Sequence, residues 1–265
     1  MDKFIEKDKY DVYDLEKIVD LLRRPGGCPW DREQTHESIR RNFIEEAYEA
    51  VEAIDEKSPA HLQEELGDVL LQVVFHAQME REQGGFSLDD VADGVCKKLI
   101  LRHPHVFGDV RVADSAQVLT NWDAIKRVEK DQKTVTDSLN AVARSLPALW
   151  RAEKVQKKAA KAGFDWPDIS GALDKLEEEL AELRQALQSG EGVEDELGDV
   201  LFSAVNAARF AGVDPEQALT GSTDKFIRRF SGLEQAALAA GRKLEDMTLD
   251  EMEDLYQNEK EHEKQ

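Results

Sequence analysis

The sequence predicts an all-α protein that contains two copies of one helical unit. Three observations support this fold class. Only 7 prolines occur in 265 residues, so most of the chain is free to form helices. Apolar residues recur three and four positions apart, the period of an amphipathic helix, and no convincing alternating strand pattern occurs. The same acidic motif also stands once in each half of the chain.

The acidic motif has two elements in a constant order. In the first half, residues 45–49 read EEAYE and residues 65–70 read ELGDVL. In the second half, residues 178–182 read EELAE and residues 196–201 read ELGDVL again. The two elements are offset by 133 and 131 residues between the halves. This near-constant offset indicates a tandem duplication.

Further elements repeat around the acidic motif. A basic pair at i and i+4 and a downstream aromatic residue follow it in both halves: Lys98, Arg102 and Trp122 in the first, and Lys225, Arg229 and Tyr256 in the second. A short aromatic turn precedes it, at residues 28–31 and again at 164–167. We therefore expect an N-terminal domain at 1–130 and a C-terminal domain at 146–265. The polar stretch 131–145 is the expected linker.

Helix boundaries follow from the local signals in each unit. Apolar residues keep a 3–4 spacing from 62 to 77 and from 197 to 208, which predicts two equivalent long helices with their leucines in the core. Pro59 and Pro215 are expected in loops or first helical turns, and Gly84 with Gly85 is expected to end a helix. We expect four or five helices per unit.

The carboxylates of the motif are spaced to share a helix face. Residues three apart lie on the same face, so two packed helices would bring together four carboxylates in each unit. These quartets are Glu46, Glu49, Glu65 and Asp68 in the first unit, and Glu179, Glu182, Glu196 and Asp199 in the second. Carboxylates held together in a partly buried cleft repel one another unless a cation neutralises them. An all-oxygen donor set favours Mg²⁺, or Mn²⁺ in its place, over Zn²⁺.

A solvated helix face is the ordinary explanation of any single glutamate in such a sequence. Two features favour the metal interpretation for the quartets. Asp68 and Asp199 lie beside the apolar stripe instead of opposite it. Gly67 and Gly198 also weaken their helices by about 1 kcal/mol each, at the same place in both copies. We expect another helix or a ligand to approach closely at these glycines.

The basic pairs and the aromatic residues can each be interpreted as structural or as substrate-binding residues. Each Lys/Arg pair could form ordinary ion pairs with the many acidic residues, or it could hold the phosphates of a substrate. Trp122 and Tyr256 could be core or interface residues, or they could stack on a nucleotide base. The spacing alone leaves these alternatives open.

Together, EExxE, ExxD and the downstream Lys/Arg pair resemble the MazG family of all-α nucleoside triphosphate pyrophosphohydrolases. The phrases at 27–31, 102–107 and 144–149 are also similar to MazG, and the resemblance spans residues 15–260. It implies Mg²⁺-dependent hydrolysis of NTPs and dNTPs, with broad base tolerance, to the monophosphate and pyrophosphate. It also implies four-helix-bundle cores that are completed by dimerisation, in a homodimer or a higher homo-oligomer.

The resemblance also implies roles for individual residues of the second unit. Its quartet would be catalytic and would bind the metal. Five further residues would contact the nucleotide: Lys175, Glu178, Lys225, Arg229 and Tyr256. In the first unit, the quartet would bind a second metal, and a second substrate site would use Glu45, Lys98, Arg102 and Trp122.

Two positions of the sequence indicate that the candidate sites of the two units are not equivalent. Lys175 stands three residues before Glu178, whereas Asn42 stands three residues before Glu45. Tyr256 stands where the family often has tryptophan, so base stacking could be weaker there. We therefore expect the second unit to be the main catalyst and the first to be weaker or regulatory.

The overall amino-acid composition limits the classes of partner that the protein is expected to bind. Acidic residues outnumber basic ones 56 to 35, which gives a net charge of −21 and argues against nucleic acid or an anionic membrane as a partner. Two isolated cysteines, no apolar stretch long enough for a span and no apolar leader at the start favour a cytoplasmic protein. Two alternatives stay open: a non-catalytic helical scaffold, and a narrower pyrophosphatase for particular dNTPs or damaged nucleotides.

Overall fold

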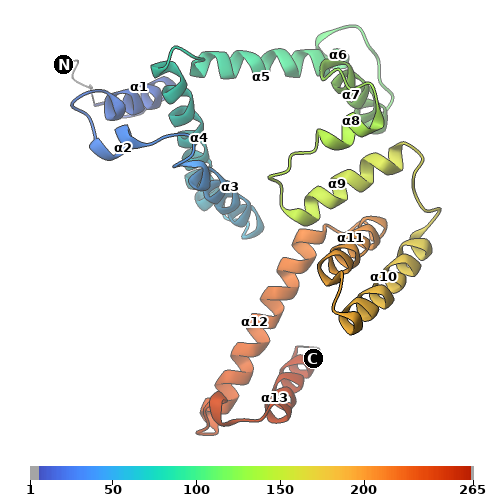
Figure 1. The fold of residues 1–265 in the computed structure, drawn as a ribbon. Helices are drawn as coiled ribbons and strands as arrows, with labels where there is room; N and C mark the ends of the chain where they lie inside the picture. The colour runs from blue at the N-terminus through green and yellow to red at the C-terminus, as the bar shows by residue number, and fades with distance from the viewer. Residues whose placement is uncertain (1–5, 264–265) are drawn as a thin grey trace. The chain divides into compact units, whose positions relative to one another are not determined.

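The computed structural model describes residues 6–263 and contains only helices and connecting segments there (Figure 1). The chain divides into two compact units, residues 1–126 and 127–265, and each is described by itself. Residues 1–5 and 264–265, at the outer ends of the two expected domains, lie outside the described residues. The predicted all-α class and the duplication of the unit are confirmed.

Two long helices dominate the first unit. Its helices are α1 (Val12–Arg23), α2 (Pro29–Glu33), α3 (Arg40–Asp55), α4 (Pro59–Glu82), α5 (Leu88–Arg102), α6 (Pro104–Phe107) and α7 (Ser115–Glu129), the last of which runs across the division between the units. A short turn joins α3 to α4, so the two helices pack against each other as an antiparallel hairpin. Pro59 occupies the first turn of α4 behind the capping side chain of Ser58, as the sequence predicts.

The core of the first unit lies where α1 crosses α4. Val19 of α1 and Val74 of α4 are fully buried, and Phe75, Met79 and Ile39 pack around them. This packing holds the C-terminal half of α4 against α1. The N-terminal half of α4, which carries Glu65 and Asp68, is left to pair with α3.

The second unit repeats the helical hairpin. Its helices are α8 (Val135–Asn140), α9 (Ala148–Lys161), α10 (Ile169–Ser189), α11 (Val193–Ala211), α12 (Pro215–Ala239), the 3₁₀ turn η1 (Leu244–Asp246) and α13 (Leu249–His262). Gly190 and Gly192 both have positive φ, 78° and 73°, in the tight turn between α10 and α11. Helix α9 packs on α11, and α13 packs beside α12 (Figure 1). The α10–α11 hairpin is the counterpart of α3–α4.

Two expectations about the helices are wrong. Each unit has more than the four or five helices expected, because short helices such as α2, α6 and α8 lack the length that a periodic pattern needs. Four leucines expected in the core are exposed: Leu66, Leu70, Leu197 and Leu201. The described helices of their own unit leave these faces of α4 and α11 open to solvent. None of the described helices combines the length and apolar character that a membrane span needs.

Candidate metal centres

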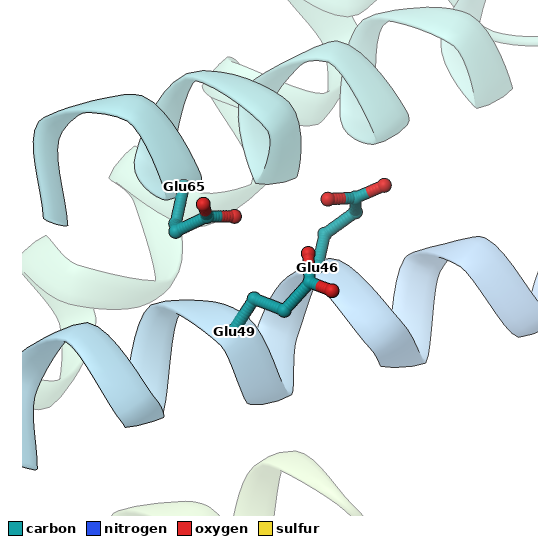
Figure 2. A group of neighbouring side chains, drawn as sticks. All are labelled: Glu46, Glu49 and Glu65. Carbon is teal, nitrogen blue, oxygen red and sulfur yellow. The ribbon is translucent and has the colours of Figure 1, made fainter. Parts of the chain in front are cut away.

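The first acidic cluster lies between α3 and α4. Glu46 and Glu49 extend from α3 toward Glu65 of α4, and the three carboxylates face one another across the hairpin (Figure 2). One oxygen from each lies within 4.8 Å of the others, close enough for a single cation to contact all three. Glu65 is buried, with 8% of its surface exposed. Burial of a glutamate beside two others is unusual without a neutralising partner.

Electrostatic repulsion is built into this cluster. The pKa of Glu46 is raised, first by burial and then by the negative charges of Asp68, Glu49 and Glu65. The pKa of Glu65 is also raised, by burial and then by Glu49, while His61 opposes the shift. Asp68, which lies outside the tight group of three, therefore still contributes to the field that a cation would experience.

The second cluster lies between α10 and α11. Glu179 of α10 meets Glu196 and Asp199 of α11, again with oxygens within 4.8 Å of one another. Glu179 is buried with 5% exposure. One carboxylate oxygen of Glu179 and one of Glu196 are buried without a hydrogen-bond partner. A buried, unpartnered carboxylate oxygen is costly unless a cation or another ligand contacts it.

Glu182, the fourth acid of the second quartet, lies outside the group of three but acts on it through its charge. The pKa of Glu196 is raised, first by burial and then by the charges of Glu182, Glu179 and Asp199. The donor atoms are all carboxylate oxygens, which suit a hard divalent cation such as Mg²⁺ or Mn²⁺. The buried unpartnered oxygens and the mutual repulsion both fit such an ion.

The two clusters differ in the cation that contacts them. The Lys175 ammonium lies 2.8 Å from a carboxylate oxygen of Glu178 and 2.6 Å from one of Glu179. These two bonds raise the pKa of Lys175 well above its ordinary value. In the first unit the corresponding position is Asn42, and the partner of the buried acid is instead His61, whose Nε2 lies 3.2 Å from Glu65.

The predicted basic pair of the second unit lies on the α12–α13 hairpin. Arg229 binds Glu263 through Nε at 2.8 Å and Nη2 at 2.7 Å, and its guanidinium lies 6.0 Å from the ring centre of Tyr256. Arg228 donates to the other oxygen of Glu263 at 2.8 Å. Lys225 is exposed. Within the described residues, no hydrogen bond or ion pair joins this group to the acids of α10 and α11.

The predicted pair of the first unit is arranged around Trp122. The guanidinium of Arg102 and the ammonium of Lys126 lie 5.2 Å and 4.9 Å from the centre of the Trp122 ring. Lys98 is exposed. Glu45 is engaged by Arg41 at 2.7 Å, on the outer side of α3. The structure therefore brings together the acids of each quartet, and it places the basic and aromatic residues on separate elements.

Sequence reasoning missed three contacts of these groups. Glu263 holds Arg229 but lies outside the repeated motifs, so no spacing pointed to it. His61 stands four residues before Glu65, a helical spacing that could have revealed it. Lys126 stands four residues after Trp122 in the same way.

The glycines of the ELGDVL elements are free of neighbours in each unit. A Cβ atom at Gly67 or at Gly198 would meet nothing within 4 Å. No other helix of its own unit therefore approaches either glycine. The expected close approach of another helix or a ligand stays a prediction.

Comparison with known proteins identifies the family to which these paired acidic hairpins belong. The profile of the MazG nucleotide pyrophosphohydrolase domain matches residues 34–107 and 169–232, one segment in each unit. The chain belongs to the MazG family. Each matched segment begins at or before the first acidic helix of its unit and includes both helices of the acidic hairpin.

Curated relatives are similar to this chain over most of its length. It is 45% identical to the nucleoside triphosphate pyrophosphohydrolase/pyrophosphatase MazG of Thermotoga maritima, over 93% of this chain and 94% of that protein. It is 43% identical to the nucleoside triphosphate pyrophosphohydrolase of Escherichia coli, over 94% and 97% of the two chains. It is also 48% identical to YabN of Bacillus subtilis, where the match covers 94% of this chain and 52% of the relative.

Proposed function

We propose that this protein is a cytoplasmic, Mg²⁺-dependent enzyme that hydrolyses nucleoside triphosphates to the monophosphate and pyrophosphate, with Mn²⁺ as a substitute metal. The acid cluster of α10 and α11, in which Glu179 is buried and one oxygen each of Glu179 and Glu196 has no partner, is the observation that carries the proposal. Membership in the MazG family and the names of the relatives support the choice of substrate and products.

In this proposal, the acidic residues of the second unit bind the metal and activate the attacking water. Glu179, Glu182, Glu196 and Asp199 would hold the metal. Bound Mg²⁺ supplies positive charge to the phosphate oxygens and lowers the pKa of a water molecule. One carboxylate of the quartet orients or deprotonates the attacking water. The water oxygen forms a bond to the α-phosphorus, and the bond from that phosphorus to the bridging oxygen breaks, so that pyrophosphate leaves.

Cationic side chains stabilise the leaving group in this proposal. Lys175 already lies among the acids, where its ammonium bonds to Glu178 and Glu179. When phosphate oxygens arrive, the same ammonium can donate to them, with Glu178 keeping it oriented. Lys225 and Arg229 grip the β- and γ-phosphates, and Tyr256 contacts the base, as in the family.

A homodimer, or a larger homo-oligomer, completes the site. The acids lie on α10 and α11, whereas Lys225, Arg229 and Tyr256 lie on α12 and α13. Exposed apolar side chains also mark the outer faces of these helices: Leu197, Leu201, Phe202, Leu219, Phe226 and Ile227. Such faces are typical of an interface that resembles a core cut in half. Static light scattering tests this part of the proposal, and a monomer at micromolar concentration would contradict it.

The first unit is the weaker or regulatory site. It keeps the metal quartet Glu46, Glu49, Glu65 and Asp68, and a second substrate site would use Glu45, Lys98, Arg102 and Trp122. Asn42 supplies no charge where the second unit has Lys175. Arg102 is buried against Trp122. Fewer free cations therefore face an incoming triphosphate.

Product analysis tests the proposed reaction. The protein is incubated with a panel of NTPs and dNTPs, with Mg²⁺ or with EDTA, and the products are separated. Monophosphate plus pyrophosphate from every base, only with metal, is the expected result. Diphosphate plus phosphate would contradict attack at the α-phosphorus. Turnover of one base alone would favour the narrower pyrophosphatase, and no turnover would favour the helical scaffold.

A further inference from the structure

The aromatic turn before α10 places one ring directly against that helix. The Trp166 ring lies so close to Gly171 that a Cβ atom there would be 2.9 Å from Cδ2 and Cε3 and 3.1 Å from Cγ. Any other amino acid at 171 would displace the ring. The indole nevertheless stays 45% exposed, so one part of it rests on α10 while another faces solvent.

A network of polar contacts holds this turn in place. Arg209 of α11 donates from Nη1 and Nη2 to the two carboxylate oxygens of Asp165, at 3.0 and 2.5 Å. The backbone N–H of Trp166 also donates to Asp165, at 3.0 Å. Nε of Arg209 is bonded to Asn206 of the same helix at 2.9 Å. The turn is therefore tied to the α11 side of the acidic hairpin and is not a free flap.

The ring stands in line with the acidic cluster. Gly171, Lys175 and Glu179 follow one another at single-turn intervals along α10. With a rise of about 1.5 Å per residue, Lys175 lies about 6 Å and Glu179 about 12 Å along the helix from the glycine under the ring. A flat aromatic surface, an ammonium and a carboxylate cluster thus succeed one another on one side of the helix. This order suits a nucleotide whose base lies on the ring and whose phosphates lie at the ammonium and the acids.

Among residues 6–263, no second ring is seen against the glycine of an acidic helix in this way. In the same turn Phe164 is 84% exposed, and among the described residues no ring or cation contact involves it. In the first unit the position corresponding to Gly171 is Ser38, at the offset of 133 residues, and Trp30 is 62% exposed. The aromatic platform next to the acids is therefore particular to the second unit.

We propose that Trp166 is a substrate-binding residue whose indole stacks on the base of a nucleoside triphosphate bound at Lys175 and the second acidic cluster. This inference rests on the proposed function and adds a second aromatic contact for the base, besides Tyr256. Stacking on an aromatic ring is tolerant of base identity because every base has a π-face. Trp166 therefore contributes affinity to all substrates without selecting one.

Three variants test the assignment. Trp166→Ala removes the ring, Trp166→Phe keeps an aromatic face, and Phe164→Ala is the matched control from the same turn. We expect Trp166→Ala to raise KM about tenfold to hundredfold for every base, with kcat within about twofold. Trp166→Phe should recover most of the affinity, and Phe164→Ala should resemble the wild type.

Two readouts separate stacking from structural damage. Calorimetric titration with Mg²⁺ alone and inhibition by inorganic tripolyphosphate, which has phosphates but no base, should both be unchanged in Trp166→Ala. An unchanged KM in Trp166→Ala, an equal loss in Phe164→Ala, or a parallel loss of Mg²⁺ and tripolyphosphate affinity would overturn the assignment. Binding of an α,β-methylene nucleotide is measured alongside. Wild-type protein that binds it without ever cleaving nucleotides would sink the proposed function, while the binding data still judge Trp166.

Discussion

The two acidic hairpins share their carboxylates and differ in what surrounds them. In α3–α4, the buried acid Glu65 is contacted by His61, a side chain whose charge depends on pH. In α10–α11, the buried acid Glu179 is contacted by Lys175, which is permanently charged at neutral pH. The second hairpin also has Trp166 resting on Gly171.

On the proposed function, four carboxylates are one part of a nucleotide site and do not define the whole. A bound metal would neutralise the acids, and a triphosphate would also need cations and a surface for the base. The second hairpin supplies Lys175 and Trp166 from within its own unit. The first has Asn42 and Ser38 at the corresponding positions. The two hairpins therefore share their carboxylates, and only the second has Lys175 and Gly171 at these positions.

Exchanging the cation should produce a large change in this comparison. Lys175→Asn gives the second hairpin the residue of the first, and we expect kcat/KM to fall about tenfold to hundredfold, as expected when a charge-assisted bond to phosphate is lost. The control is Lys157→Asn, which removes an exposed lysine paired with Glu153 on α9. Steady-state pyrophosphate release measures both. A Lys175→Asn enzyme with wild-type kcat/KM would remove Lys175 from the site.

Metal binding should stabilise the second hairpin more than the first. Saturating Mg²⁺ is expected to raise the melting temperature by several degrees, because it binds the folded clusters and relieves their repulsion. Asp199→Asn should reduce this increase clearly, while Asp68→Asn should reduce it less, since Asp68 lies outside the tight group of three. Differential scanning calorimetry with and without Mg²⁺ measures the shift. Equal reductions in the two variants would argue that the hairpins bind metal alike.

A smaller effect is expected at the residue that holds Arg229. Glu263→Gln weakens the ion pair that orients the Arg229 guanidinium, and we expect KM to rise about threefold with kcat unchanged. Glu261→Gln, which alters an exposed neighbour on the same helix, is the control. If both variants retain the wild-type KM, then Glu263 has no positioning role.

The smallest effect concerns the turn that carries Trp166. The hydrogen bond from Arg209 is the main cause that lowers the pKa of Asp165 below its ordinary 3.8. A lowered carboxyl pKa stabilises the folded state above the unfolded-state value, and the stabilisation is lost as pH falls through the folded-state value. Asp165→Asn should therefore lower the melting temperature modestly at neutral pH, and this difference should shrink as the pH falls below 3.8. A difference that persists unchanged at low pH would exclude the ion pair as its source.

Much of each site could be predicted because it is local. Glu46 with Glu49, and Glu196 with Asp199, lie three apart, and a short turn joins each helix to its partner, so spacing alone brings the acids together. The all-α class and the duplication followed from the same periodic signals. Helix propensity and period carry this information within a few turns of chain.

The parts that depend on distant packing could not be predicted. Spacing placed Lys225 and Arg229 on one face of a helix, but it could not say that Glu263 would engage the arginine. It also assigned Leu66 and Leu197 to the core, although the structure leaves them exposed. The period of a helix identifies an apolar face and gives no information about which surface covers it.

The inequality of the two hairpins is tested most directly by removing one equivalent acid from each. Pyrophosphate release from an NTP is compared for Glu196→Gln and Glu65→Gln, two substitutions at matched positions of the ELGDVL element. We predict that Glu196→Gln loses at least about 100-fold in kcat, because it removes a metal ligand from the main site. Glu65→Gln should keep most of the activity. Equal losses in the two variants would contradict the assignment of catalysis to the second hairpin.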